Sequence, residues 1–342
     1  MKLFNTIDRK ILKQQLGDYT MLRITLSYYK YYRLNNINFF RDYLYLHYNN
    51  IGVLGRVYVA NEGINAQISV PKENWDAFLQ FHNNVTFLKN NRLNLAREDD
   101  GKSFYKLKIK VRPKIVADGL NDESFDVTKG GKHLNAIEFN QLSENKDTVI
   151  VDMRNHYESE VGHFKNAITP DVDTFRDSLP IILKTLQKER DKNIVMYCTG
   201  GIRCEKASAW FKHNGFENVY QLDGGIIEYA KQVNEQKLEN KFIGKNFVFD
   251  ERLGERITNE VIATCHLCGK TCDTHTNCKN EACHLLFIQC ESCAEKYNGC
   301  CSQTCKEIFE LPLEEQRMLR KGKNEARNVF KKGRSSVLKH KK

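Results

Sequence analysis

Apolar residues recur along residues 20–116 at two spacings, every second residue in some stretches and every third or fourth in others. The first spacing is typical of strands and the second of helices. The predicted strands are residues 20–29, 55–60, 65–70 and 102–116, and the predicted helices are residues 35–50 and 72–83. Because their order is β-α-β-β-α-β, we expect a ferredoxin-like domain over residues 1–118.

Continuous apolar runs replace this alternation in the middle of the chain. Three of them predict buried strands, DTVIVDMRN (147–155), NIVMYC (193–198) and NVYQLDGG (218–225), and CEKASAWFKHNG (204–215) predicts a helix. Strands that alternate with helices form parallel sheets covered by helices. We therefore expect an α/β domain over residues 132–236, after a polar linker at 119–132 that contains two adjacent glycines.

The rest of the chain changes composition again. Residues 237–316 comprise a connector and a cysteine-rich module, and residues 317–342 form a basic tail. The fold class expected is thus a multidomain protein of α+β and α/β parts. The sequence has no apolar run long enough to cross a membrane and no signal-peptide core at its N-terminus. We expect a cytoplasmic protein with no membrane partner, whose cysteines are reduced.

Five cations alternate with aliphatic residues in the last predicted strand of the first domain. The cations are Lys106, Lys108, Lys110, Arg112 and Lys114. Because strand side chains alternate between faces, the cations would line one face while the aliphatic residues pack beneath. Like charges in a row repel one another, so the pattern favours a phosphate-binding surface over a merely solvated face.

The net charge of +10 is unevenly distributed. Residues 317–342 hold eleven Lys and Arg against one Glu, and residues 1–120 hold 19 against 10 Asp and Glu, so the middle of the chain is acidic. A basic front and a basic tail indicate a polyanionic partner bound at two ends. Charge alone leaves a solubilising tail as an equal alternative.

The loop CTGGIRC follows the strand 193–198 and leads into a helix, so Cys198 lies at the carboxyl edge of the predicted sheet. Thr199, Gly200, Gly201 and Ile202 complete the loop before Arg203. Backbone N–H groups, the helix N-terminus and the Arg203 charge would all lower the pKa of a thiol there. We expect Cys198 to be the nucleophile, as a thiolate or a persulfide, with Arg203 assisting. Cys204 either packs in the core or resolves an oxidised Cys198.

Ten of the twelve cysteines lie between Cys265 and Cys305. Two C-x2-C pairs, Cys265/Cys268 and Cys290/Cys293, have a spacing close to that of a zinc ribbon, and we expect them to bind one metal ion. Six other cysteines and three histidines suffice for a second site, without indicating which of them bind. Zinc is favoured over an iron–sulfur cluster, and free thiols are the alternative to any metal.

The central motifs resemble those of rhodanese domains. CTGGIR is preceded by VDMRN and GHFKNAI and followed by LDGG, and Asp152, Arg154 and Gly162–His163 match the motifs before the active loop. The resemblance implies a rhodanese-like domain whose cysteine carries sulfur as a persulfide. Cysteine phosphatases need C-x5-R to encircle a phosphate, whereas Cys198 and Arg203 are one residue closer, which argues against a phosphatase.

Three blocks in order extend the resemblance to roughly residues 20–320. GRVYVANEGINAQISV, YCTGGIRCEKASAWF and the cysteine pattern from CHLCG onward resemble the bacterial tRNA uridine(34) hydroxylase family. This implies an acylphosphatase-like first domain, tRNA as the partner, and oxygen-dependent conversion of the wobble uridine to 5-hydroxyuridine, with O2 as co-substrate and Cys198 as the active residue. No binding of DNA is expected.

Two other functions remain open from the residues alone, a sulfurtransferase that uses thiosulfate or a protein persulfide and a non-enzymatic RNA-binding adaptor. The polar turn NEGINAQ is either a plain hairpin or a substrate contact, and the neighbouring tyrosines (Tyr28, Tyr29, Tyr31 and Tyr32) either pack or stack on bases.

Overall fold

The computed structural model describes residues 22–97, 99, 101–321 and 332–340, together with residues 3–5, 7, 11 and 12. The first two residues of the strand predicted at 20–29 lie outside these ranges. So do five of the tail cations, Lys323, Arg327, Lys331, Lys341 and Lys342. No helix of the described residues is long and apolar enough to cross a membrane.

The N-terminal domain is built on a five-stranded sheet with the order β4-β1-β3-β2-β5. Its elements are β1 (Arg23–Tyr31), α2 (Ile37–Ile51), β2 (Leu54–Ala60), β3 (Gly63–Pro71), α3 (Trp75–Asn84), β4 (Asn94–Leu95) and β5 (Leu107–Val111). The predicted β-α-β-β-α-β order is confirmed, but the strand that completes it is the short β4 beside β1. The identification of residues 102–116 as that strand is wrong, because only 107–111 form a strand, at the opposite edge and parallel to β2.

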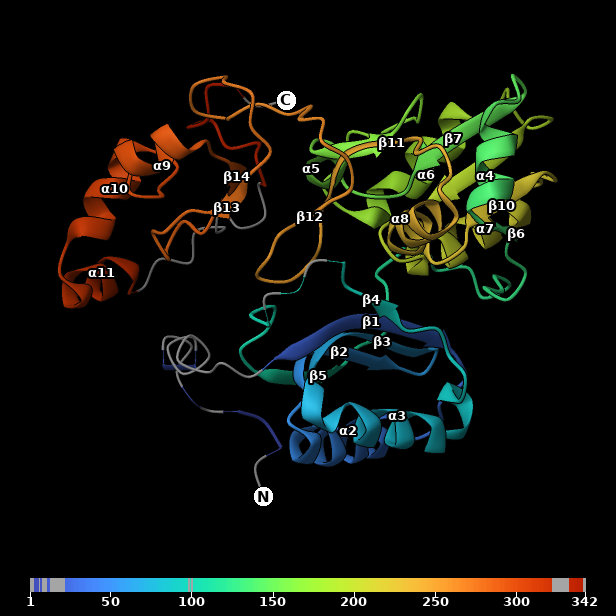
Figure 1. Cartoon of the computed structure of the whole chain (residues 1–342), viewed down its shortest axis with the longest axis horizontal. Coiled ribbons are helices and arrows are strands. Elements are labelled where there is room, and N and C mark those ends of the chain that lie inside the picture. The colour runs from blue at the N-terminus through green and yellow to red at the C-terminus, as the bar shows by residue number, and fades with distance from the viewer. Residues whose placement is uncertain are drawn as a thin grey trace.

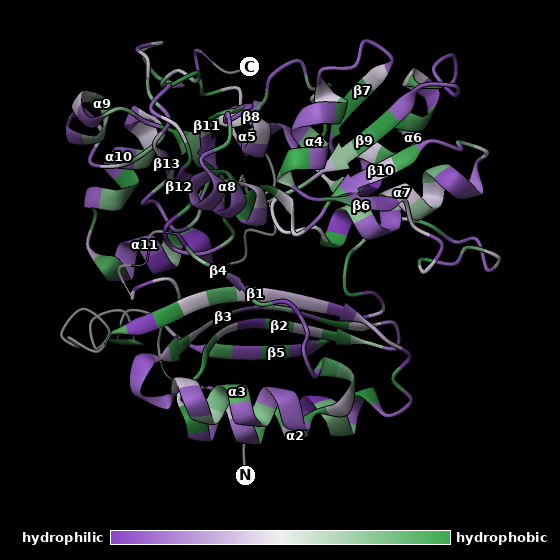
Figure 2. Ribbon diagram, turned by 45° about the vertical axis from the view of Figure 1, so that its right-hand side comes forward, coloured by the Kyte–Doolittle hydropathy of each residue, from purple (hydrophilic) through white to green (hydrophobic). Residues whose placement is uncertain are grey.

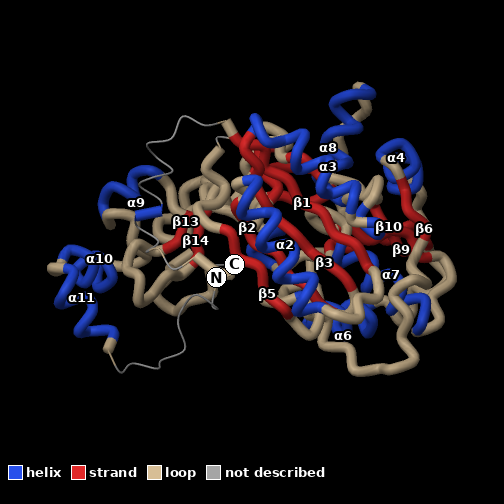
Figure 3. Tube along the Cα trace, turned by 90° about the horizontal axis from the view of Figure 1, so that it is seen from below, coloured by secondary structure: helices blue, strands red, loops and turns tan. Residues whose placement is uncertain are grey.

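Both helices of this domain cover one face of the sheet. Helix α2 starts where the Asn36 side chain accepts a hydrogen bond from Phe39 N, and ends at Gly52, which has φ 80°. Apolar residues of α2 and α3 pack with the inward residues of β1–β3 and β5 in one core. Figure 2 shows α2 and α3 below the sheet and the central domain and the cysteine module above it, and Figure 3 shows both helices lying over the strands. The upper face is therefore free to build a site.

The central domain has a parallel sheet, as predicted, and the order of its strands is β6-β10-β9-β7. Its strands are β6 (Lys132–Leu134), β7 (Thr148–Asp152), β9 (Asn193–Tyr197) and β10 (Val219–Leu222). Residues of α6 (Phe175–Thr185) and α7 (Ile202–His213) pack on one face, and residues of α4 (Ala136–Ser143) and α8 (Gly225–Gln236) on the other. The short helix α5 (His156–Ser159) follows β7.

The connector packs back on the central domain, since β11 (Phe242–Asn246) pairs with β8 (Gly162–Phe164) and with β12 (Glu255–Arg256). The cysteine module then adds the hairpin β13 (His275–Asn277) and β14 (Leu286–Ile288), followed by α9 (Glu291–Lys296), α10 (Gln303–Glu310) and α11 (Leu313–Arg320). Figure 1 places α9, α10 and α11 to one side of the other two domains.

Described residues of the basic tail are engaged within the molecule. Lys332 donates a 2.7 Å hydrogen bond to Tyr157 Oη, Arg334 pairs with Asp171, and Leu338 is buried in the cysteine module. Arg317 and Arg320 pair with Glu314 and Glu281. This part of the tail therefore ties the module to the central domain.

Candidate functional site

Cys198 follows β9 directly and begins a loop that ends at the first turn of α7. Gly201 has φ +97°, a conformation that L side chains rarely adopt, and this turn directs the Gly201 N–H at Cys198 Sγ at 3.2 Å. The thiol itself is 1% exposed. The loop thus holds one sulfur atom within a ring of backbone donors, as the sequence predicts.

Burial alone would raise the pKa of the Cys198 thiol. A hydrogen bond from the Cys204 side chain, the Arg203 charge and the backbone N–H groups of both residues outweigh burial, and together lower that pKa from 9.0 to about 6. The pKa of Cys204 is raised by its own burial and by the neighbouring Cys198. Cys204 lies in the core at 0% exposure, so it packs and also donates to Cys198.

We expect the alkylation rate of Cys198 by iodoacetamide to reach half its maximum near pH 6. With a pKa of about 6, the thiolate outnumbers the thiol by about ten to one at pH 7. The pKa of Cys198 is lower in the folded protein than in the unfolded chain, so the thiolate stabilises the folded state. This stabilisation is complete above about pH 9 and is lost as the pH falls through 6. Peptide mapping by mass spectrometry gives the rate. Cys204 should stay unlabelled, and a midpoint near pH 9 would contradict this assignment.

Arg203 is held in place by a buried carboxylate that was not predicted from the sequence. Glu158 in α5 accepts two hydrogen bonds from the Arg203 guanidinium, at 2.7 and 2.8 Å, and its side chain is 0% exposed. Arg203 also donates to Thr199 Oγ1 at 3.3 Å. Burial would raise the pKa of Glu158, but the Arg203 charge holds it below its usual value. Arg203 therefore keeps its charge while facing the cysteine loop.

Glu158→Gln is expected to lower the free energy of unfolding by about 3–5 kcal/mol, because it leaves the Arg203 guanidinium buried without a counter-charge. Glu138→Gln is a matched control. Both carboxylates accept the backbone N–H of the residue three positions earlier, at 3.0 Å, but Glu138 is only partly buried and its partner Lys132 is exposed. Urea denaturation of both variants measures the difference, and equal losses would refute a specific role of the Glu158–Arg203 pair.

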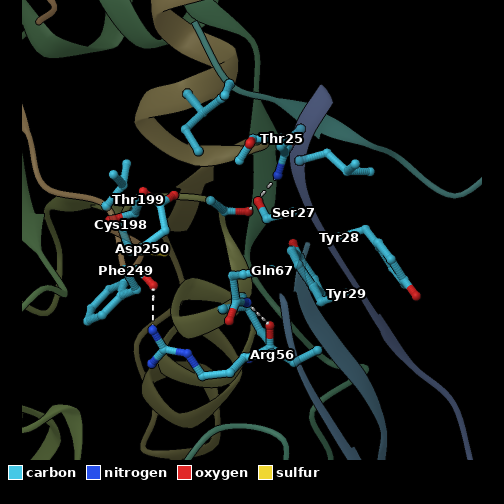
Figure 4. Close-up of a pocket in the computed structure, with 18 of the residues that line it drawn as sticks. Thr25, Ser27, Tyr28, Tyr29, Arg56, Gln67, Cys198, Thr199, Phe249 and Asp250 are labelled. Atoms are coloured by element: carbon cyan, nitrogen blue, oxygen red, sulfur yellow. Dashed lines mark hydrogen bonds between the residues drawn. The ribbon is translucent and has the colours of Figure 1, made fainter. Parts of the chain in front are cut away.

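The cysteine loop faces the open side of the N-terminal sheet across a cavity of about 290 Å³. Cys198, Thr199, Gly200, Ile202 and Arg203 line one wall. The opposite wall comes from the sheet and the third from the connector around Phe249. Figure 4 shows Ser27, Tyr29, Gln67 and Arg56 on the sheet side and Cys198, Thr199 and Phe249 across from them. The Cys198 thiol thus borders a cavity that is formed by the two domains and the connector together.

The turn NEGINAQ contributes both an ion pair between the two domains and a part of the cavity wall. Glu62 accepts hydrogen bonds from Lys206 Nζ at 2.8 and 2.9 Å, and Lys206, itself buried on α7, also contacts Asp118 at 2.5 Å. These ion pairs fasten the two domains together. Asn65 and Gln67 instead line the cavity. Tyr28 and Tyr29 also border it. The Tyr29 hydroxyl donates to Glu205 at 2.9 Å, and Tyr28 belongs to the buried core of the N-terminal domain.

The structure brings together four of the five predicted cations, two on the edge strand β5 and two directly beside its ends. Leu107 and Ile109 are buried while Lys108 is exposed, and the neighbouring charges of Lys106, Lys110, Arg56 and Arg112 add to burial in lowering the pKa of Lys108. Lys114 lies past the end of β5 and forms an ion pair with Asp118 at 2.6 Å. Arg56, which was not predicted from the sequence, lies opposite Lys108 in register and also lines the cavity.

Two groups of four cysteines converge in the C-terminal module. The first is Cys265, Cys268, Cys290 and Cys293, the set predicted from spacing, and the second is Cys278, Cys283, Cys301 and Cys305. Within each group the sulfur atoms lie within 4.8 Å of one another, and adjacent ones lie 3.6–3.7 Å apart. Tetrahedral Zn–S bonds of about 2.3 Å place sulfurs about 3.8 Å apart, so both groups fit a metal ion. Neither group includes a histidine.

Comparison with known proteins covers all three parts of the chain. Family models match at residues 23–115 (UPF0176 acylphosphatase like domain), 135–232 (Rhodanese-like domain) and 243–306 (Rhodanase C-terminal). A rhodanese-like domain protein of Staphylococcus aureus is 26% identical with a TM-score of 0.25, over 29% of this chain and 90% of that one. The predicted fold class, an acylphosphatase-like domain, a rhodanese-like domain and a cysteine cluster, is confirmed.

Two curated relatives match nearly end to end. The tRNA uridine(34) hydroxylases of Photorhabdus laumondii and of Yersinia pestis strain Pestoides F are each 56% identical to this chain over 333 residues. The aligned region covers 97% of this chain and 95% and 94% of the relatives, respectively. The chain therefore belongs to the tRNA uridine(34) hydroxylase family.

Proposed function

We propose that this enzyme hydroxylates the wobble uridine of tRNA at C5, with O2 as the oxygen source and Cys198 as the active residue. Membership of the family supports the reaction. One observation supports Cys198 as the site of the proposed reaction: its thiol has a lowered pKa and lies at the wall of a cavity between two domains. One oxygen atom enters the C5–H bond. The other leaves as water with two protons and two electrons, which a thiol reductant supplies.

The residues around Cys198 prepare the thiolate and exclude water from it. Gly201 N–H donates to the sulfur, and Arg203, held by Glu158, supplies a fixed positive charge. A thiolate beside a uracil ring is a nucleophile able to add reversibly at C6, which makes C5 electron-rich. The buried position of Cys198 restricts this chemistry to a base that enters the cavity, as in enzymes that flip their target base out of the stack.

The edge of the N-terminal sheet forms the proposed tRNA surface. A groove of about 400 Å³ adjoins the cavity and shares Arg56, Phe104, Phe249 and Asp250 with it. Its charged lining consists of four cations, Arg56, Lys106, Lys108 and Lys332, and two carboxylates, Asp250 and Glu251. The excess of cations suits the phosphates that flank a base inserted in the cavity. Lys110 and Arg112 extend the surface, whereas Lys114 is engaged with Asp118.

Replacing Lys106, Lys108 and Lys110 together by Gln is expected to weaken tRNA binding. The slope of the logarithm of the association constant against the logarithm of the salt concentration should also become less steep by about three, one for each lost phosphate contact. The loss should be equal for all tRNA sequences, because phosphate contacts carry no base specificity. Lys184→Gln on the exposed surface of α6 provides the control for charge. An unchanged salt slope in the triple variant would place the tRNA elsewhere.

We also propose that both cysteine groups bind zinc, which would hold together a module with little apolar core of its own. The metal has a structural role there because four cysteines complete a tetrahedral shell and leave no open position.

The proposed function is tested by incubating unmodified tRNA with the purified protein in air and in a thiol buffer, followed by mass spectrometry of the nucleosides. A gain of one oxygen on the uridine at position 34, absent without O2, is the expected result. Transfer of sulfur from thiosulfate without any change in tRNA would instead indicate a sulfurtransferase.

A further inference from the structure

One row of polar side chains crosses the entire open face of the N-terminal sheet. The strand registers place Lys108 opposite Arg56, Arg56 opposite Gln67, Gln67 opposite Ser27, and Ser27 opposite Asn94. At its far end Asn94 Nδ2 donates to Gly200 O of the cysteine loop at 3.3 Å. The row therefore runs from the basic edge, along the cavity wall, to the active loop, and Gln67 lies at its centre.

The orientation of the Gln67 carboxamide is determined by a chain of two hydrogen bonds. Asn65 Nδ2 donates to the backbone carbonyl of Ile115 at 3.1 Å, and a carbonyl can only accept, so Asn65 Oδ1 must face the other way. That oxygen accepts from Gln67 Nε2 at 2.5 Å. Gln67 therefore cannot exchange its oxygen and nitrogen without losing this bond.

One hydrogen-bonding edge of Gln67 remains available to a ligand. Among the described residues, neither Oε1 nor the second N–H of Gln67 has a partner, and Gln67 lines the cavity opposite the cysteine loop. Figure 4 shows its side chain between those of Arg56 and Tyr29. An acceptor and a donor side by side on a fixed amide form a reader of one nucleobase edge.

We propose that Gln67 selects uracil at position 34, with Oε1 accepting from N3–H and the free N–H donating to O4. Uracil presents a donor at N3 beside an acceptor at position 4, whereas cytosine presents an acceptor beside a donor. Cytosine bound in the same orientation would require the oxygen and nitrogen of the Gln67 carboxamide to exchange places. The hydrogen bond from Gln67 to Asn65 opposes that exchange. Ser27 and Arg56 on either side of Gln67 face the adjoining ribose and phosphate. This inference rests on the proposed function, because it places the target base in the same cavity.

The test compares two unmodified tRNA transcripts that differ only in U or C at position 34, with binding measured by titration at fixed salt. The natural protein is expected to bind the U34 transcript about tenfold or more tightly than the C34 transcript. Gln67→Leu should bring that ratio close to one. Gln67→Glu, nearly isosteric but unable to donate, should also lose most of it. Gln187→Leu, at an exposed position after α6, is the control and should keep the ratio.

A second measurement uses a modified transcript, and its main result comes from the natural protein and does not depend on how the variants fold. A transcript with 3-methyluridine at position 34 lacks the N3–H donor, so the natural protein should bind it about tenfold more weakly than the U34 transcript. This difference should disappear in Gln67→Leu. An unchanged U34 to C34 ratio in folded Gln67→Leu, or equal binding of the methylated transcript by the natural protein, would overturn the inference.

The same samples separate this inference from the proposed function. If the natural protein hydroxylates U34 and Gln67→Leu keeps the full ratio, the reaction stands and the role of Gln67 is refuted. If no transcript is hydroxylated although the U34 preference depends on Gln67, the base-reading site stands and the proposed reaction is refuted.

Discussion

Cys198→Ser is expected to lower the rate of 5-hydroxyuridine formation by about 10³-fold or more while tRNA binding is unchanged. The lowered pKa of Cys198 makes the thiolate the prevailing form at neutral pH, whereas a serine hydroxyl in the same ring of donors stays protonated. The basic edge strand, which carries the proposed tRNA contacts, lies in another domain. Single-turnover assays with quantified nucleosides, beside a tRNA binding titration, measure both quantities.

Cys272→Ser is the matched control for this substitution. Cys272 is a half-buried thiol that belongs to neither four-cysteine group, so its loss should leave the rate unchanged. A Cys198→Ser variant that retains more than about a tenth of the natural rate would show that the thiolate does not carry the reaction.

Cys290→Ser and Cys301→Ser are each expected to reduce the bound metal from two equivalents to one and to open the C-terminal module to proteases. Each removes one of four ligands of a different group. Metal binding to such sites contributes about 10 kcal/mol or more, and most of it is coupled to folding of the module. Elemental analysis gives the metal content, and limited proteolysis with mass spectrometry reports the module separately from the two other domains.

Cys300→Ser provides the control for the second group. Cys300 is buried directly beside Cys301 but belongs to neither group, so two equivalents of metal should remain. A natural protein that contains no metal after purification without chelators, or a Cys300 variant that loses metal as Cys301→Ser does, would contradict the ligand sets.

The features that could be predicted from the sequence are those encoded locally. The cysteine loop lies between a buried strand and a helix, and the strand itself places Cys198 at the sheet edge. The C-x2-C pairs likewise determine one metal group. The second group was not predictable, because Cys272 and Cys300 are indistinguishable in spacing from its members, and only the hairpin β13–β14 with the turn before α10 brings the right four together.

The features that were missed depend on contacts between distant segments. Residues 107–111 carry the alternation of an ordinary strand, and nothing in that pattern states which edge of the sheet they join. Glu158 is far from Arg203 in sequence, and only packing of α5 against the loop shows that they pair. The polar row through Gln67 likewise arises from strand register and from docking of two domains.

The decisive experiment follows labelled oxygen into position 34 of tRNA. Unmodified tRNA is incubated with the protein and a thiol reductant under ¹⁸O₂, and Cys198→Ser is treated in parallel. We expect the natural protein to form 5-hydroxyuridine that carries the heavy oxygen, and the variant to form none. Equal product from both proteins, or product that carries only oxygen from water, would contradict this expectation.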